Sequence, residues 1–279
     1  MTGILRFVRK TATALIFVIA AGGVNAQTAS TSTNTTSDPQ AVTLAAQSVR
    51  ALTGGTAVSD VTLTGTATQT AGSWNASGAA TFKAKGFAES RVDFAASSQS
   101  EIHGLDASGN PAGAWIGSPA KTDSTRHTMA LHNSFSDAAW FFPALTSLGA
   151  ASQAGVVAKY IGAETHNGVA TQHVRLWHTA SSYSNLAAIA TVIPRLSTVD
   201  IYLDATSSLP VALAFNAHSD KDMNTDVPIE VRYSDYQAVN GVRIPFHVQK
   251  YLNNGLVMDF TASSATINSG LSDALFSTQ

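Results

Sequence analysis

The sequence predicts a mainly β protein with a few short helices, built as a curved antiparallel sheet. Two observations lead to this fold class. After residue 58 apolar and polar side chains alternate with a period of two over long stretches, and successive side chains of a strand point to opposite faces of a sheet. Several of these stretches are separated by Asn-Gly pairs, which tolerate the positive φ angles that tight hairpins need.

The first 26 residues have the pattern of an export signal. Three basic side chains, the last being Lys10, precede an apolar stretch from Thr11 to Val24, and the segment ends at Ala26. This stretch is too short to cross a bilayer comfortably, so a signal peptide is favoured over a membrane anchor. We therefore expect a Sec-type signal peptide over residues 1–26. The mature protein is then periplasmic or secreted and not membrane-integral.

Composition narrows the function classes. The chain has 279 residues, a formal charge of −2 at pH 7 and 12% charged residues, so no nucleic-acid partner is expected. It contains no cysteine, which excludes thiolate zinc sites, iron–sulfur clusters and a lipid anchor on an N-terminal cysteine. A mature chain of roughly 250 residues is long enough to bury a core without disulfides. We expect no metal and no cofactor.

A leader and one helix are expected before the sheet. Residues 27–37 are a low-complexity run rich in Ser and Thr, which predicts a disordered leader. Asp38 and Pro39 then form a helix start signal. Apolar residues from Val42 to Leu52 recur at helical spacing before two glycines end the run. No linker follows, so we expect a single domain over residues 38–279.

The strand signals are strongest in two places. From Trp74 to Phe82 every second residue is apolar or small. In the C-terminal half, Asn240-Gly241 joins the predicted strands 229–239 and 242–252, and a second Asn-Gly turn leads into the strand 256–267. These last three strands predict an antiparallel meander.

Two segments interrupt the strands. Ser134–Leu148 is typical of a capped helix that Pro143 kinks or ends, and Ser184–Ile193 is typical of a short helix stopped by Pro194. A sheet with one apolar face must cover that face, and these helices are the only cover in the sequence. We therefore expect a curved, incompletely closed sheet with helices in its concavity. A two-sheet sandwich is the alternative, but it leaves the helices without a place.

Six short stretches of the C-terminal half carry a family resemblance. They are Val199–Asp204, Leu209–Val211, Val231–Tyr236, Val239–Val242, Ile244–Pro245 and the closing Ile267–Phe276. These turn residues and core positions resemble the LolA/LolB-type lipoprotein-carrier superfamily. The resemblance implies a half-barrel of about eleven strands, with a helical lid in the concave face and an apolar cavity for acyl chains. The arginines that known carriers use find no match here, and the segment 180–194 departs from the smallest members.

Carriage of an acyl chain needs only a concave apolar surface, because each buried methylene gains about 0.8 kcal/mol. The residues expected to bind such a ligand are bulky apolar side chains of the predicted strands and of the 134–148 segment: Trp74, Phe82, Phe94, Trp140, Phe141, Phe142, Phe215 and Met258. Ordinary core packing is the alternative for each of them. The consecutive Trp140, Phe141 and Phe142 are the strongest candidates, since three bulky neighbours cannot all point inward from one helix face.

Known catalytic motifs are missing from the sequence. It has no Gly-x-Ser-x-Gly elbow, no His-Glu-x-x-His and no phosphate-binding glycine loop. The pairs His127/His132 and His173/His178 are each five residues apart, which places their members on opposite faces of a strand and argues against a shared metal. We therefore expect no catalytic residues, and histidines that are exposed or hydrogen-bonded within the structure.

Two acidic groups are expected to be solvated. Asp200 and Asp204 share a strand face, where solvated charges are common, so acid–base catalysis is not expected of them. The run from Asp220 to Asp226 alternates like a calcium loop, but it lacks the glycine that such loops require at the sixth position. We interpret this run as a solvated loop between strands.

Three functions remain open. The first is an exported soluble carrier that binds a lipid, an acyl chain or a lipoprotein in an apolar cavity, as the resemblance implies. The second is a non-enzymatic binding or scaffold protein of the cell envelope, with a filled concavity and a protein partner. The third is a hydrolase, which would need two titratable side chains within hydrogen-bond reach in a cleft. We expect a protein that is not an enzyme.

Overall fold

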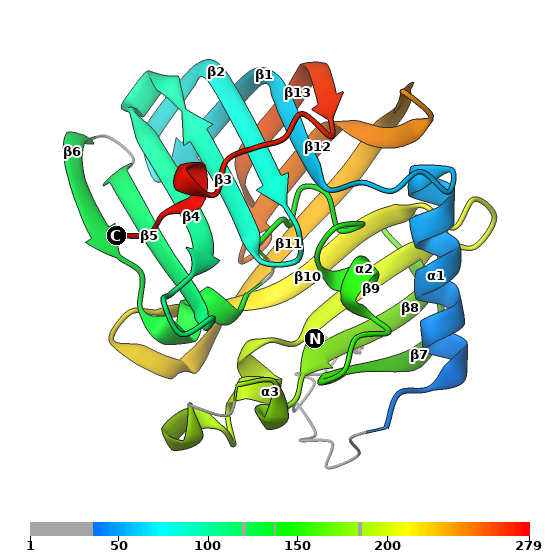
Figure 1. Ribbon diagram of the computed structural model, residues 1–279. Coiled ribbons are helices and arrows are strands. Elements are labelled where there is room, and N and C mark those ends of the chain that lie inside the picture. Colours follow the sequence, from blue (N-terminus) through cyan, green and yellow to red (C-terminus); the bar gives the residue numbers. More distant parts are fainter. Residues whose placement is uncertain (1–35, 119–120, 137, 184–185) are drawn as a thin grey trace, which may run out of the picture. The chain divides into compact units, whose positions relative to one another are not determined.

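Thirteen strands form one antiparallel sheet in the computed structural model (Figure 1). The structure describes residues 36–118, 121–136, 138–183 and 186–279, which belong to one compact unit. The strand order is β6-β5-β4-β3-β2-β1-β13-β12-β11-β10-β9-β8-β7. Neighbours in the sheet are therefore neighbours in the chain, except where β1 pairs with β13.

Most strands are joined by short turns. Their bounds are β1 Asp60–Ala71, β2 Trp74–Lys85, β3 Glu89–Phe94, β4 Gln99–Leu105, β5 Pro111–Ser118, β6 Lys121–Thr128, β7 Val156–His166, β8 Val169–His178, β9 Val199–Asp204, β10 Pro210–Ser219, β11 Asp222–Val239, β12 Val242–Leu252 and β13 Gly255–Ile267. The mainly β, antiparallel fold class is confirmed. The described sheet has two strands more than the expected eleven, and three of its strands, β4 to β6, lie in a stretch where the sequence alternation is weak.

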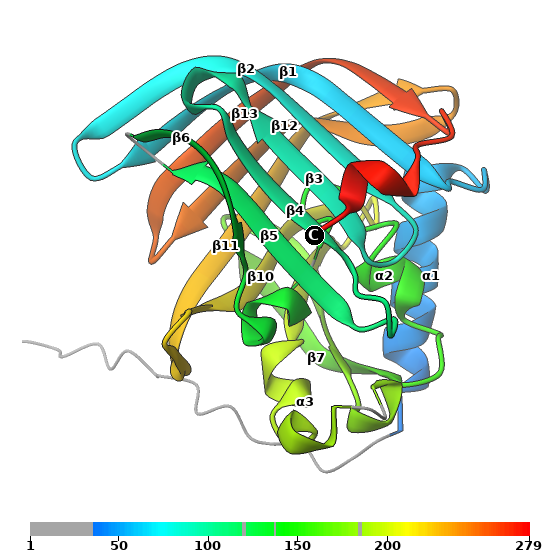
Figure 2. The same ribbon diagram turned by 60° about the vertical axis from the view of Figure 1, so that its left-hand side comes forward.

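The sheet is open and strongly bent. Strands β6 and β7 form its two edges within the described residues. Figures 1 and 2 show the arm that contains β2 to β5 curving over the arm that contains β8 to β11. The bend brings Glu101 of β4 to 3.8 Å from Lys250 of β12, although these strands are five steps apart in the sheet order.

The apolar core lies on the concave face. Leu63 of β1 is paired with Phe82 of β2, and both are fully buried. On the other arm Ile201 of β9 and Leu213 of β10 are paired and also fully buried. The period of two thus sends one set of side chains from each strand into a common core, as the alternation predicted.

The predicted first helix is confirmed. It is α1, Pro39–Thr53; Asp38 accepts a hydrogen bond from the backbone N–H of Gln40, and Gly54 ends the helix with φ of 60°. The capping carboxylate satisfies one of the free N–H groups of the first turn. Ala45 and Leu52 are fully buried on the side that faces β7, β8 and β12, so α1 covers part of the concave face.

The two other predicted helices are wrong in extent. Instead of one helix over Ser134–Leu148, the chain forms a short 3-10 helix at Leu131–Phe135, a series of turns, and α2 at Ser147–Ala150. Pro143 has no N–H to continue a helix, and the turns let the bulky residues at 140–142 enter the core together.

Proline also redefines the second segment. Instead of a helix over Ser184–Ile193, the described part contains a short 3-10 turn at Ala187–Ile189 and then α3, Ile193–Leu196. Pro194 therefore lies in the first turn of α3 and does not stop a helix. This is a position that proline favours, because the N–H that it lacks would be unpaired there anyway.

The hairpin turns follow the sequence prediction. Asn167, Asn240 and Asn253 all have positive φ angles between 47° and 50°, at the β7–β8, β11–β12 and β12–β13 connections. The meander of β11, β12 and β13 is confirmed. The signal peptide over 1–26 lies outside the described residues, as does most of the leader over 27–37. Both remain predictions, and so does the single domain over 38–279.

Candidate functional site

A cleft of about 610 Å³ opens at one end of the concave face. Its walls come from the β1–β2 hairpin, from β4 and β5, from β10 to β13, and from the segment that contains Trp140. This volume lies in the range of about 300–1,000 Å³ that is usual for small-molecule sites. Most of the exposed wall is apolar, with Trp74, Phe215 and Met258 among its side chains.

Strand register places the polar residues of the cleft. On adjacent strands Gln69 of β1 is paired with Met258 of β13, and Met258 is paired with Lys250 of β12. Directly paired residues project from the same face of a sheet. The hairpins therefore put an amide, a thioether and an ammonium group side by side on the concave face.

Lys250 is held between a carboxylate and an indole ring. Its Nζ lies 3.8 Å from Glu101 Oε2 and 4.5 Å from the centre of the Trp140 ring, and its side chain keeps only 16% of its exposure. Glu101 Oε1 is 3.1 Å from Nε2 of His103. The charge of Lys250, opposed by burial and assisted by the hydrogen bond with His103, lowers the pKa of Glu101 to about 2. Glu101 and Lys250 thus form a charged pair at neutral pH.

Three buried polar atoms of the cleft residues have no hydrogen-bond partner within the described structure: Gln69 Oε1, His103 Nδ1 and Trp140 Nε1. Buried polar groups in folded proteins are nearly always paired. Three such atoms in the lining of one cleft indicate a place where another molecule supplies the partners.

Comparisons with known proteins bear on the fold. No family model matches the sequence, and no curated protein matches it as a relative. Among solved structures, a domain from Vibrio parahaemolyticus assigned to outer-membrane lipoprotein sorting is 12% identical; the match covers 85% of this chain and 96% of that one, with a TM-score of 0.52. A DUF1329 family protein from Desulfovibrio piger is also 12% identical over the same shares, with a TM-score of 0.53. The fold is LolA-like. The predicted resemblance is thereby confirmed at the level of architecture.

Half of the predicted ligand-binding residues line the cleft of this LolA-like sheet. Trp74, Trp140, Phe215 and Met258 do so. The other four, Phe82, Phe94, Phe141 and Phe142, are buried in the core and do not line the cleft. The predicted lining thus divides between a cleft and a packed centre.

The packed centre is formed by aromatic rings. The ring of Phe82 stacks on that of Phe260 with centroids 4.1 Å apart, and it lies 5.2 Å from Phe141 and 5.4 Å from Trp140. Trp140 therefore touches both regions. Tyr233 of β11 donates a hydrogen bond to the backbone carbonyl of Trp140, which fastens this segment to the sheet.

The polar residues of the cleft were missed from the sequence, although a signal was present. Lys250 follows Val248 and precedes Leu252 in the alternation of β12, so a charge occupies a position that should face the core. Glu101 and His103 alternate in the same way on β4. A charge at an inward position of a strand needs a partner or a ligand. Which partner it meets depends on the bend of the sheet.

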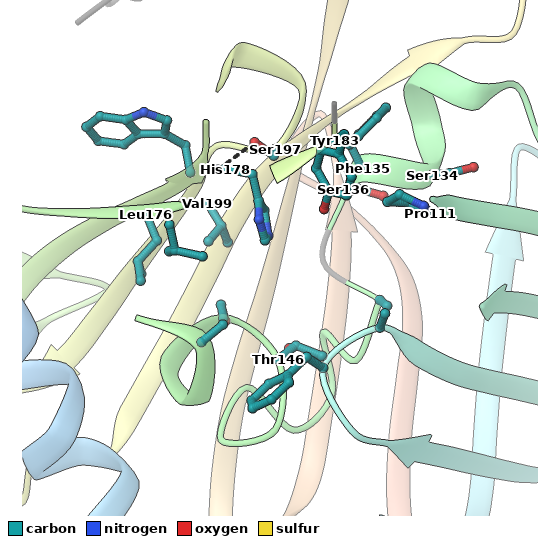
Figure 3. A pocket seen from close by; sticks show the side chains of 17 residues that line it. Pro111, Ser134, Phe135, Ser136, Thr146, Leu176, His178, Tyr183, Ser197 and Val199 are labelled. Atoms are coloured by element: carbon teal, nitrogen blue, oxygen red, sulfur yellow. Dashed lines mark hydrogen bonds between the residues drawn. The ribbon is translucent and has the colours of Figure 1, made fainter. Parts of the chain in front are cut away.

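A smaller hollow of about 170 Å³ lies elsewhere in the LolA-like domain (Figure 3). His178 and Tyr183 face each other there with ring centroids 5.7 Å apart. Burial lowers the pKa of His178 and raises the pKa of Tyr183 to about 12. Both rings are therefore uncharged at neutral pH. The hollow is below the usual size of a ligand site.

The other histidine and aspartate predictions have mixed outcomes. No group of three or more His, Asp or Glu side chains that could hold a metal occurs in the part of the chain that the structure describes. His173 is hydrogen-bonded to Asp200 at 2.6 Å, and His178 lies on the same strand, as expected. His127 and His132 do not share a strand, because His132 lies in the 3-10 helix after β6.

The acidic runs make local contacts within the protein. Asp204 accepts hydrogen bonds from the backbone N–H groups of the β9–β10 turn. The predicted solvated loop at 220–226 is wrong in extent, because β11 already begins at Asp222. Asp226 pairs with Arg195 at 2.8 Å and so is occupied within the protein.

Chemistry in the cleft would require a nucleophile beside a base. Glu101 and His103 are two titratable side chains within hydrogen-bond reach. The second ring nitrogen of His103 has no partner in the described structure, so the ring holds no hydroxyl group in place for attack. The described residues also contain no helix that is long and apolar enough to span a membrane.

Proposed function

We propose that this protein is an exported, non-enzymatic carrier that holds a lipid, a free acyl chain or the acyl chain of a lipoprotein in the cleft. The LolA-like fold supports the proposal at a coarse level. A related architecture in the Vibrio parahaemolyticus domain is assigned to lipoprotein sorting. Export to the periplasm or the medium is part of the same proposal and rests on the basic and apolar pattern of residues 1–26.

The observation that carries the proposal is the apolar wall of the cleft. Trp74, Phe215 and Met258 come from three separate hairpins and meet around one space of about 610 Å³. An acyl chain of 14 carbons that left water for this wall would gain on the order of 10 kcal/mol before the cost of ordering it. No catalytic group is needed for this task.

We further propose that the chain between β6 and β7 serves as the helical lid. This chain contains the short helix at Leu131–Phe135 and α2, and it supplies Trp140 to the cleft. Figure 1 shows α2 on the concave side of the sheet, beside α1. Movement of such a lid would admit a chain that is longer than the present cleft.

The proposal is tested by native mass spectrometry of protein purified from membranes. We expect a co-bound lipid mass that disappears after organic extraction and returns on incubation with lipid. Phe215→Glu places a charge in the apolar wall and should reduce lipid retention at least tenfold. A matched control is Ile161→Glu, which adds the same charge at an exposed position of β7 outside the cleft lining. Protein that is always empty and never reloads would contradict the proposal.

A second candidate is favoured by the packed centre. Phe82, Phe141 and Phe142 are fully buried, so much of the concavity is filled by the protein itself. A filled concavity suits an envelope scaffold protein that binds a protein partner by its outer surface. Chemical crosslinking in envelope fractions would then recover one reproducible partner, and no lipid would be retained.

A further inference from the structure

We infer that the cleft selects its ligand by the head group, and that this head group is uncharged and carries both hydrogen-bond donors and an acceptor, as in a monoacylglycerol. This inference rests on the proposed carrier function and deepens it. It concerns the polar end of the cleft, formed by Gln69, Glu101, His103, Trp140 and Lys250. We call this set the head-group site.

The charges of the head-group site are already neutralised. Glu101 and Lys250 form a pair at 3.8 Å. The face of the Trp140 ring, which could attract a cation, is covered by the ammonium of Lys250. A ligand cation would compete with Lys250 for both partners. A ligand anion would lie beside the Glu101 carboxylate, and Asp220 adds a second negative charge to the lining of the cleft.

The unpaired atoms of the head-group site define the complementary ligand. The indole Nε1–H of Trp140 can only donate, and Oε1 of Gln69 can only accept. His103 donates from Nε2–H to the Glu101 carboxylate, so its neutral ring leaves Nδ1 as an acceptor. All three atoms are buried without a partner in the described structure. Together they require two donors and one acceptor.

A glycerol ester of one fatty acid meets this requirement. Its two hydroxyl groups supply two donors, and its oxygen atoms supply acceptors for the indole N–H. Its single chain fits the apolar wall at Trp74, Phe215 and Met258. A fatty-acid carboxylate has no donor for Gln69 or His103, and a quaternary ammonium head has neither donor nor acceptor.

The test compares three ligands with the same 14-carbon chain: 1-monomyristoylglycerol, myristate at pH 8 and tetradecyltrimethylammonium, each below its micellar concentration. Tryptophan fluorescence reports binding, since three of the four tryptophans, Trp74, Trp115 and Trp140, line the cleft. We expect monomyristoylglycerol to bind at least about tenfold more tightly than either charged ligand, as expected when a buried donor or acceptor gains its partner.

Gln69→Leu removes the acceptor and keeps the approximate size of the side chain. It should weaken monomyristoylglycerol about tenfold and leave myristate within twofold. Gln237→Leu, the same change on an exposed part of β11, is the matched control and should alter neither ligand. The comparison of the three ligands uses the unaltered protein, so it decides the question even where a variant folds poorly.

The outcomes separate the two proposals. Equal binding of all three ligands, or a preference for a charged head, would overturn the head-group inference and leave the carrier function standing. Failure of all three ligands to bind would overturn the head-group inference, and an empty protein in native mass spectrometry would then overturn the carrier function as well.

Discussion

The packed centre and the cleft use the same kinds of side chain for different ends. In the centre, the rings of Phe82, Phe141 and Phe260 touch one another and exclude water. In the cleft, Trp74 and Phe215 surround a space. The two regions meet at Trp140, which packs on Phe82 on one side and carries the ammonium of Lys250 on the other.

The difference teaches that aromatic content does not mark a binding site. The centre is the more aromatic of the two regions, and it has no polar atom to orient a ligand. The cleft has fewer rings, but it has an ion pair and three unpaired polar atoms at one end. Polar groups that converge on an apolar space are therefore the better guide to function.

The largest expected effect tests whether the centre is solid. Phe82→Ala should lower the free energy of unfolding by about 3–5 kcal/mol, because it removes a fully buried ring and leaves a cavity. Urea unfolding followed by circular dichroism measures this change. Phe87→Ala, at a side chain that is 57% exposed, should cost less than about 1 kcal/mol. A loss below 1 kcal/mol for Phe82→Ala would mean that the centre is not closely packed.

The ion pair of the cleft should show a smaller effect that depends on pH. Glu101→Gln or Lys250→Met alone should cost about 1–2 kcal/mol, less than a fully buried pair, because Glu101 keeps 37% of its side-chain exposure. The double variant should recover part of this loss, since neither change then leaves a lone charge. Double-mutant cycles in urea measure the coupling.

The sign of the pH dependence follows from the lowered pKa. The carboxyl of Glu101 has an ordinary pKa of 4.5 and a folded pKa of about 2, so its stabilising contribution is present above pH 4.5 and is lost as the pH falls through 2. The difference in stability between the wild type and Glu101→Gln should shrink over this range. A difference that stays constant from pH 6 to pH 2 would show that Glu101 is not held as a charged partner of Lys250.

Trp74→Ala sharpens the comparison from the side of the cleft. Trp74 is only half-buried, so the loss in stability should be about 1 kcal/mol, while the affinity for a 14-carbon ligand should fall at least tenfold. Calorimetric titration and urea unfolding of the same sample measure both. Equal losses in stability for Trp74→Ala and Phe82→Ala would remove the distinction between the two regions.

The smallest effect concerns the cover of the centre. Asp38→Ala removes the N-cap of α1 and should cost about 0.5–1 kcal/mol. Because α1 lies against β7, β8 and β12 and supplies no residue to the cleft, ligand affinity should not change. Thermal unfolding and fluorescence titration measure the two quantities. A changed affinity would mean that α1 and the cleft are coupled.

The local pattern was sufficient for much of the fold. The period of two, the Asn-Gly turns and the cap at Asp38 predicted the helix α1, the paired strands of the C-terminal half and the LolA-like architecture. It failed for the segment 134–148, where burial of Trp140, Phe141 and Phe142 in the core outweighs their helical spacing. The two extra strands were missed because the stretch after β3 alternates poorly.

The sequence by itself determined which side chains face inward, because a strand sends alternate residues to opposite faces whatever lies around it. Only the tertiary structure decided which inward residues fill the centre and which line a cleft. Glu101 and Lys250 are 149 residues apart in the chain and meet because the sheet bends. That bend arises from the twist and packing of all the strands together, so no local stretch of sequence encodes it.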